Sequence, residues 1–117
     1  MQSSIIQVFN IIGTSYAVDA QDGETVFESI KKYFDKKRAV KLSFLNIELA
    51  TTSFLNTAIG KLYGSFDDSY IAENLIIVDF DEVTKEQIEK VKESAKMFYK
   101  DPQWLEESIK NIVEGKE

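Results

Sequence analysis

Hydrophobic residues in this chain occur in short apolar runs that alternate with stretches in which they recur every three to four residues. One of these runs contains no Gly or Pro, and its apolar residues are Val40, Leu42, Phe44 and Leu45. Such a run is typical of a central strand covered on both faces. A helical period follows it at Phe54, Leu55, Ala58, Ile59, Leu62 and Tyr63. The pattern predicts a strand, a polar turn and an amphipathic helix that faces the sheet and ends at Gly64.

The polar turn between this strand and its helix is rich in hydroxyl groups. Thr51, Thr52 and Ser53 stand where the helix begins, and any of their oxygens is placed to accept a hydrogen bond from an unpaired backbone N–H of the first turn. Gly60 lies inside the predicted helix, where Gly costs roughly 1 kcal/mol relative to Ala. We therefore expect Gly60 to allow close approach of another backbone.

Other apolar runs predict further strands, at residues 5–12, 16–18 and 75–80. Strands that alternate with helices are typical of an α/β domain with parallel pairing and right-handed crossovers. The chain has 117 residues and shows no internal repeat or linker. We expect one compact α/β domain over residues 1–117, with about four strands in a mixed sheet packed by about four helices.

Capping boxes and a proline mark the expected helix starts. Two pairs fit the box in which a hydroxyl residue is followed three positions later by Glu or Gln: Thr25 with Glu28, and Thr84 with Gln87. They predict helices over residues 25–36 and 84–100. An Asp-Pro pair at residues 101–102 predicts the start of a final helix. The apolar residues expected on its inward side are Trp104, Leu105, Ile109, Ile112 and Val113.

Two residue types are absent from the chain, and this limits its chemistry. There is no Cys, which excludes disulfides, thiolate nucleophiles and thiolate metal sites. There is no His either, so the commonest general base near neutral pH and the commonest metal ligand are both missing. No apolar run approaches the length of a membrane span, and the first residues lack the features of a secretory signal. We expect a cytoplasmic protein with no cofactor and no membrane contact.

The net charge of −6 is concentrated in one stretch of the chain. Residues 62–84 contain no Lys or Arg and six acids, which are Asp67, Asp68, Glu73, Asp79, Asp81 and Glu82. Because phosphate contacts need a basic face, this balance argues against a nucleic-acid binder. Such a stretch is usually a solvated loop. Two alternatives are a docking patch for a basic partner and a Mg²⁺ site on Asp79 and Asp81 with one more carboxylate.

Residues 51–64, TTSFLNTAIGKLYG, together with the strand before them, are similar to the signature of the bacterial STAS-like domain family of uncharacterised function. The likeness extends from residue 22 into the helix expected at residues 84–100, so it covers most of the chain. That family resembles the STAS domains of anti-sigma factor antagonists. In those domains the strand leads to a turn that carries a phosphorylatable Ser at the start of a helix. A partner kinase of the GHKL ATPase type controls the antagonist there and docks on the same surface.

The resemblance places the Asp-Ser-Ser-Gly-Leu pattern of that turn on residues 51–55. It makes Thr52 the candidate phospho-acceptor, with Ser53 beside it, while Thr51 replaces the acidic residue and Phe54 replaces the Gly. A phosphate of charge about −1.5 to −2 would meet N–H donors and the positive end of the helix dipole at this position. A structural role is the simpler interpretation, because hydroxyl residues before an amphipathic helix are usually caps.

Residues and resemblance together predict a non-enzymatic regulatory module that binds another protein, with no catalytic residues. The resemblance implies a partner that is a GHKL-type ATPase or kinase and phosphorylation control at Thr52 or Ser53. The candidate partner-binding residues are Thr51, Thr52, Ser53 and Asn56. Two other functions stay open. One is a small carboxylate-based, metal-dependent enzyme that uses Asp79, Asp81 and Glu82, and the other is a homo-oligomeric structural protein.

Overall fold

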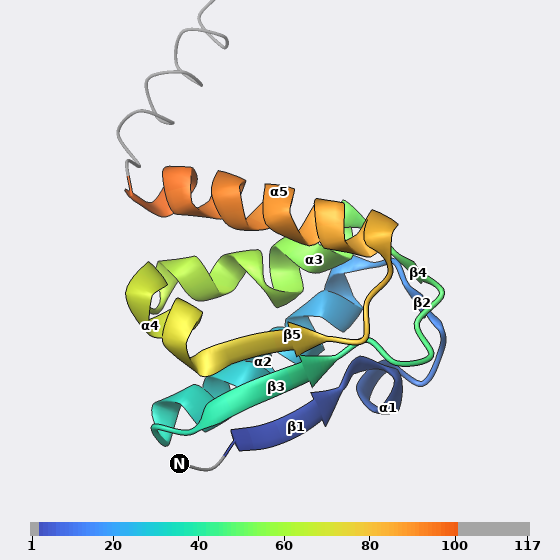
Figure 1. Cartoon of the computed structure of the whole chain (residues 1–117), viewed down its shortest axis with the longest axis horizontal. Helices are drawn as coiled ribbons and strands as arrows, with labels where there is room; N and C mark the ends of the chain where they lie inside the picture. Colours follow the sequence, from blue (N-terminus) through green and yellow to red (C-terminus); the bar gives the residue numbers. More distant parts are fainter. Residues whose placement is uncertain (1–2, 101–117) are drawn as a thin grey trace, which may run out of the picture.

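The computed structural model describes residues 3–100, which form a parallel sheet with helices packed on it (Figure 1). The elements in chain order are β1 (Ser3–Gln7), α1 (Val8–Ile12), β2 (Tyr16–Ala17), α2 (Ala20–Asp35), β3 (Ala39–Ser43), β4 (Leu49–Ala50), α3 (Thr52–Ala58), the 3₁₀ helix η1 (Gly60–Gly64), α4 (Asp68–Asn74), β5 (Leu75–Val78) and α5 (Glu82–Lys100). The final helix expected after residue 102, with its inward side, lies outside the described residues. No helix in the described part is long and apolar enough to cross a membrane.

Both sheets of the described structure are parallel. The larger has the order β1-β3-β5, so β3 is central, and the smaller pairs β2 with β4. The expected α/β class with parallel pairing is confirmed, whereas the expected mixed sheet of about four strands is wrong. Residues 8–12 leave the sheet as α1, and β2 pairs with a strand that no apolar run marks. Short apolar runs fit a buried strand or a buried helix equally well, which explains the error at α1.

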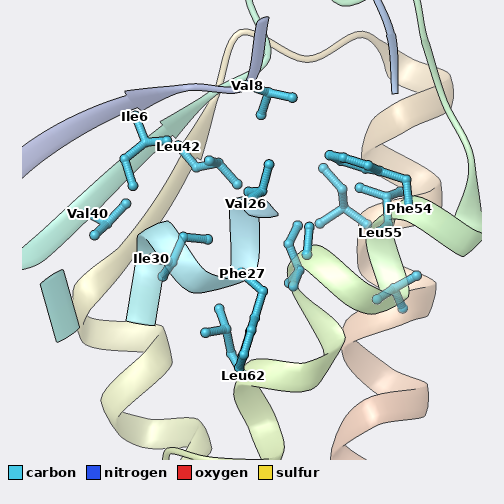
Figure 2. Packing of buried hydrophobic residues seen from close by; sticks show 14 of the residues in the cluster. Ile6, Val8, Val26, Phe27, Ile30, Val40, Leu42, Phe54, Leu55 and Leu62 are labelled. Atoms are coloured by element: carbon cyan, nitrogen blue, oxygen red, sulfur yellow. The ribbon is translucent and has the colours of Figure 1, made fainter. Parts of the chain in front are cut away.

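One face of the larger sheet carries the core. Ile6 and Leu42 are register partners on neighbouring strands and are almost fully buried. Figure 2 shows their side chains, with that of Val40, directed toward Val26 and Ile30 of α2. The helices form further layers above this face, because α2 packs on α3, and α5 packs on α3 and η1 (Figure 1).

The opposite face of this sheet is exposed at its two edge strands among the described residues. Ile5, Lys41 and Ile76 form one row across the three strands. Ile5 is 64% exposed and Ile76 is 48% exposed. Because side chains alternate between faces, these residues point away from the buried row of Ile6 and Leu42. In β3 itself, however, Ala39 and Ser43 lie on the same side as Lys41 and are buried, so the central strand is covered on both faces except around Lys41.

The close approach between helices occurs at Gly23 and not at Gly60. A Cβ atom built at Gly23 would lie 2.6 Å from the carbonyl oxygen of Phe54, so α2 and α3 touch through their backbones. A Cβ atom at Gly60 would lie 3.5 Å from Val91 and 3.7 Å from Ala95, which is ordinary van der Waals contact. The expectation for Gly60 is wrong, because the neighbour on that side is a pair of side chains on α5.

Both expected capping boxes are wrong for the same reason, since an aspartate earlier in the chain caps each helix. The carboxylate of Asp19 accepts a hydrogen bond of 2.8 Å from the backbone N–H of Asp22, so α2 begins at Ala20. The carboxylate of Asp81 likewise accepts a bond of 2.8 Å from the N–H of Thr84. Gln87 therefore has no capping role, and its Oε1 atom is buried without a partner among the described residues.

Candidate docking surface at the start of α3

Thr51 fixes the corner between β4 and α3 with its hydroxyl group. Its backbone is extended, with φ −92° and ψ 161°, as is usual for an N-cap residue. Its Oγ1 accepts a hydrogen bond of 3.2 Å from the backbone N–H of Phe54 and donates one of 2.8 Å to the carbonyl oxygen of Val18. The same hydroxyl therefore caps α3 and ties it to the chain after β2, and Thr51 is only partly exposed.

The residues of α3 that follow Thr51 point either to solvent or to the core as the helix turns. Thr52, Ser53 and Asn56 are exposed, while Phe54 and Leu55 are fully buried. Phe54 and Leu55 pack in the core beneath α3, which fixes the outward direction of the three polar residues (Figure 2). The two candidate phospho-acceptors thus stand on the surface, and neither of them is the residue that caps the helix.

The small sheet places apolar side chains beside this corner. Tyr16 and Leu49 are register partners and are 51% and 49% exposed. Val18 is also exposed, and its carbonyl oxygen is the one that receives the hydroxyl of Thr51. We call this surface the docking corner and define it as Tyr16, Val18, Leu49, Thr52, Ser53 and Asn56. Nothing in the sequence marks Leu49, because a strand of two residues has no recognisable apolar run.

The three acids proposed for a metal site have separate surroundings, and two of them accept hydrogen bonds within the fold. The carboxylate of Asp79 accepts a hydrogen bond of 2.6 Å from the hydroxyl of Ser43, which is almost fully buried. Asp81 caps α5, and Glu82 is exposed in the first turn of that helix. Among residues 3–100 no group of three or more acidic side chains is placed to hold a metal ion. The structure therefore does not bring these acids together as a ligand set.

Hydrogen bonding lowers the pKa of Asp81 below its ordinary value. The carboxylate accepts from the backbone N–H of Thr84 and from its hydroxyl, and both bonds favour the charged form. Asp79 occupies the left-handed region, at φ 62°. Asp tolerates this conformation better than most residues, so it suits the turn between β5 and α5.

A family model described as a STAS-like domain of unknown function matches residues 22–85 of the chain. The matched region runs from α2 to the first turn of α5, so it includes the buried strand β3 and Thr52, Ser53 and Asn56 of the docking corner. No curated protein and no solved structure gives a significant match.

Proposed function

The chain belongs to the family of STAS-like domains of unknown function (DUF4325), and from this premise we propose that it is a non-enzymatic regulatory module that binds another protein through the docking corner. The observation that carries the proposal is the exposed pair of Tyr16 and Leu49 on β2 and β4, because β4 leads through Thr51 into the exposed residues Thr52 and Ser53. Aromatic residues are enriched in the cores of protein interfaces.

Burial of the apolar pair would supply the binding energy. Removal of apolar surface from water stabilises a complex by roughly 25 cal/mol per Å². The corner is also cross-linked by hydrogen bonds, because Thr51 donates its hydroxyl to the carbonyl oxygen of Val18 and its backbone N–H, at 3.0 Å, to that of Ala17. A partner that binds there would order few additional side chains, which lowers the entropic cost of association.

Phosphorylation of Thr52 or Ser53 would act on the same surface. Both hydroxyl groups are exposed, so a kinase can reach them while the cap at Thr51 stays intact. A phosphate adds charge of about −1.5 to −2. A partner that covers Tyr16 and Leu49 would have to remove water from this charge, and that desolvation opposes binding. We therefore propose that the unmodified chain binds its partner and that phosphorylation releases it. The resemblance to anti-sigma factor antagonists suggests a GHKL-type ATPase as partner and kinase.

Phosphate mapping tests the switch. The full chain is incubated with GHKL-type ATPases of its host and ATP, and the modified residue is identified by mass spectrometry. We expect phosphate on Thr52 or Ser53, and none in the double variant Thr52→Ala, Ser53→Ala. Thr25→Ala, which changes an exposed hydroxyl on α2, is the matched control and should leave the modification unchanged. Unmodified Thr52 and Ser53 under conditions where the ATPase binds would contradict phosphorylation control.

A further inference from the structure

The strand β1 forms one edge of the larger sheet (Figure 1). On its inner side it pairs with β3 in an unbroken register over all five residues. The backbone N–H and C=O groups that point outward from β1 have no strand partner within residues 3–100. Ile5 stands at the middle of this edge, and its side chain is 64% exposed.

This edge lacks the features that usually prevent a strand from pairing with another chain. Soluble proteins protect the edges of their sheets with charged side chains, proline or a bulge. Residues 1–18 contain no charged side chain and no proline, although 29% of the whole chain is charged. The continuous register with β3 also excludes a bulge within residues 3–7. The outer side of β1 is therefore a template for one more strand.

The other edge of the sheet, formed by β5, is protected against a second copy of the same chain. Glu73 lies just before this strand, and Asp79 and Asp81 lie just after it. Antiparallel pairing of β5 with its own copy would bring the acids at one end against those at the other, in a protein of net charge −6. Of the two edges, β1 is the one at which two copies of this acidic chain can meet without repulsion.

We propose that the chain forms a symmetric dimer through antiparallel pairing of β1 with β1 of a second copy. A strand can pair with its own copy in this way because a two-fold axis relates the two strands, which gives a closed dimer. The two strands overlap over their whole length only when Ile5 stands opposite Ile5 of the second copy. The two sheets of three strands then join into one continuous sheet.

This register brings apolar side chains together and keeps charges apart. Directly opposite residues of an antiparallel pair are close neighbours on one face, so the two Ile5 side chains contact each other. The register partner of Ile5 on β3 is Lys41. The two copies of Lys41 lie three strand spacings apart, about 14 Å, which exceeds the screening length of about 8 Å at physiological salt. The dimer therefore covers an exposed isoleucine without opposing like charges.

Charge substitutions at residue 5 test both the dimer and its register. In analytical ultracentrifugation the wild type should show a monomer–dimer equilibrium. Ile5→Lys and Ile5→Asp should each weaken dimerisation about tenfold or more, because two like charges would stand directly opposite each other. An equimolar mixture of the two variants should form dimers again, since a lysine then faces an aspartate across the two-fold axis. Recovery in the mixture would also show that both variants are folded.

Ile76→Lys is the matched control, because Ile76 lies in the same row on the edge strand β5 and is also exposed. It should dimerise like the wild type. A wild type that stays monomeric up to millimolar concentration, loss of the dimer in Ile76→Lys, or a mixture of Ile5→Lys and Ile5→Asp that stays monomeric would each overturn the proposal. The docking corner lies outside β1 and no other protein is used, so this failure is separable from that of the proposed function.

Discussion

At the scale of single residues, the docking corner depends on Thr51. The sequence marks three neighbouring hydroxyl residues as possible caps, and nothing local distinguishes among them. The structure assigns the cap to Thr51, because the extended chain from β4 brings its hydroxyl to Phe54 and to the carbonyl of Val18 at once. That second bond joins residues far apart in the sequence. It could not have been predicted before the pairing of β2 with β4 was known.

Thr51→Val should destabilise the fold by about 1–2 kcal/mol, because it removes the cap and the bond to Val18 while it keeps the shape of the side chain. Thr51→Ser retains the hydroxyl and should recover most of the loss. The free energy of unfolding in urea measures both. Thr52→Val, at an exposed position, is the control and should change stability by no more than about 0.5 kcal/mol. A larger loss for Thr52→Val than for Thr51→Val would mean that the cap is assigned to the wrong residue.

Gly23→Ala should also destabilise the protein, although Ala is normally the better helix former. Its Cβ would lie 2.6 Å from the carbonyl oxygen of Phe54, so α2 and α3 would have to separate. Overpacking of this kind costs roughly 1–3 kcal/mol. Gly60→Ala is the matched control, because its Cβ would meet side chains at 3.5 Å or more and should leave the unfolding midpoint nearly unchanged. Equal stability of the two variants would contradict the backbone contact at Gly23.

At the scale of elements, the presence of a helix was easier to predict than the residues at which it begins and ends. The amphipathic periods of α2, α3 and α5 are strong, and all three helices are present. The first residues of α2 and α5 were misplaced, because a hydroxyl residue followed by Glu or Gln is a weaker start signal than an aspartate that already holds the first N–H group, whereas α3 begins where the hydroxyl residues predicted it. Asp19 and Asp81 each stand before the expected box. The helix α1 was missed because a run of five residues, four of them apolar, is too short to reveal its period.

The cap of α5 makes stability depend on pH in the acid range. Because the pKa of Asp81 is lower in the folded chain than its ordinary value of 3.8, its contribution is complete above that value and is lost as the pH falls through the folded pKa. Asp81→Asn keeps an acceptor but removes the charge. Wild type should be more stable than this variant near pH 6, and the difference should shrink below pH 3.8.

Urea unfolding measured from pH 6 down to acid pH tests this dependence. Asp67→Asn is the matched control, because Asp67 precedes α4 but makes no capping hydrogen bond with its side chain. The difference in the free energy of unfolding between wild type and Asp67→Asn should not shrink at acid pH in the way expected for Asp81→Asn. A stability difference between wild type and Asp81→Asn that stays constant through the acid range would show that the charge of Asp81 does not strengthen the cap.

At the scale of the whole molecule, the sequence predicted the α/β class, the central strand β3 and the start of α3, but neither the strand β4 between them nor the surface that β4 forms with β2. The pairing of β2 with β4 joins Tyr16 to Leu49 across a long stretch of chain, and each strand has only two residues. Apolar residues in such short strands give no period. Their exposure follows from tertiary packing alone, which buries Ala17 and Ala50 on the other side of the same strands.

The most direct test of the docking corner is the affinity of the full chain for a GHKL-type ATPase of its host, measured by titration calorimetry with two matched variants. Leu49→Ser removes apolar surface from the corner, and Ile5→Ser removes it from the edge strand β1 of the larger sheet, where the side chain is at least as exposed. We predict that Leu49→Ser weakens binding about tenfold or more, equivalent to about 1.4 kcal/mol, and that Ile5→Ser binds like wild type. Unchanged affinity of Leu49→Ser, with or without loss of binding by Ile5→Ser, would contradict the assignment of the docking corner.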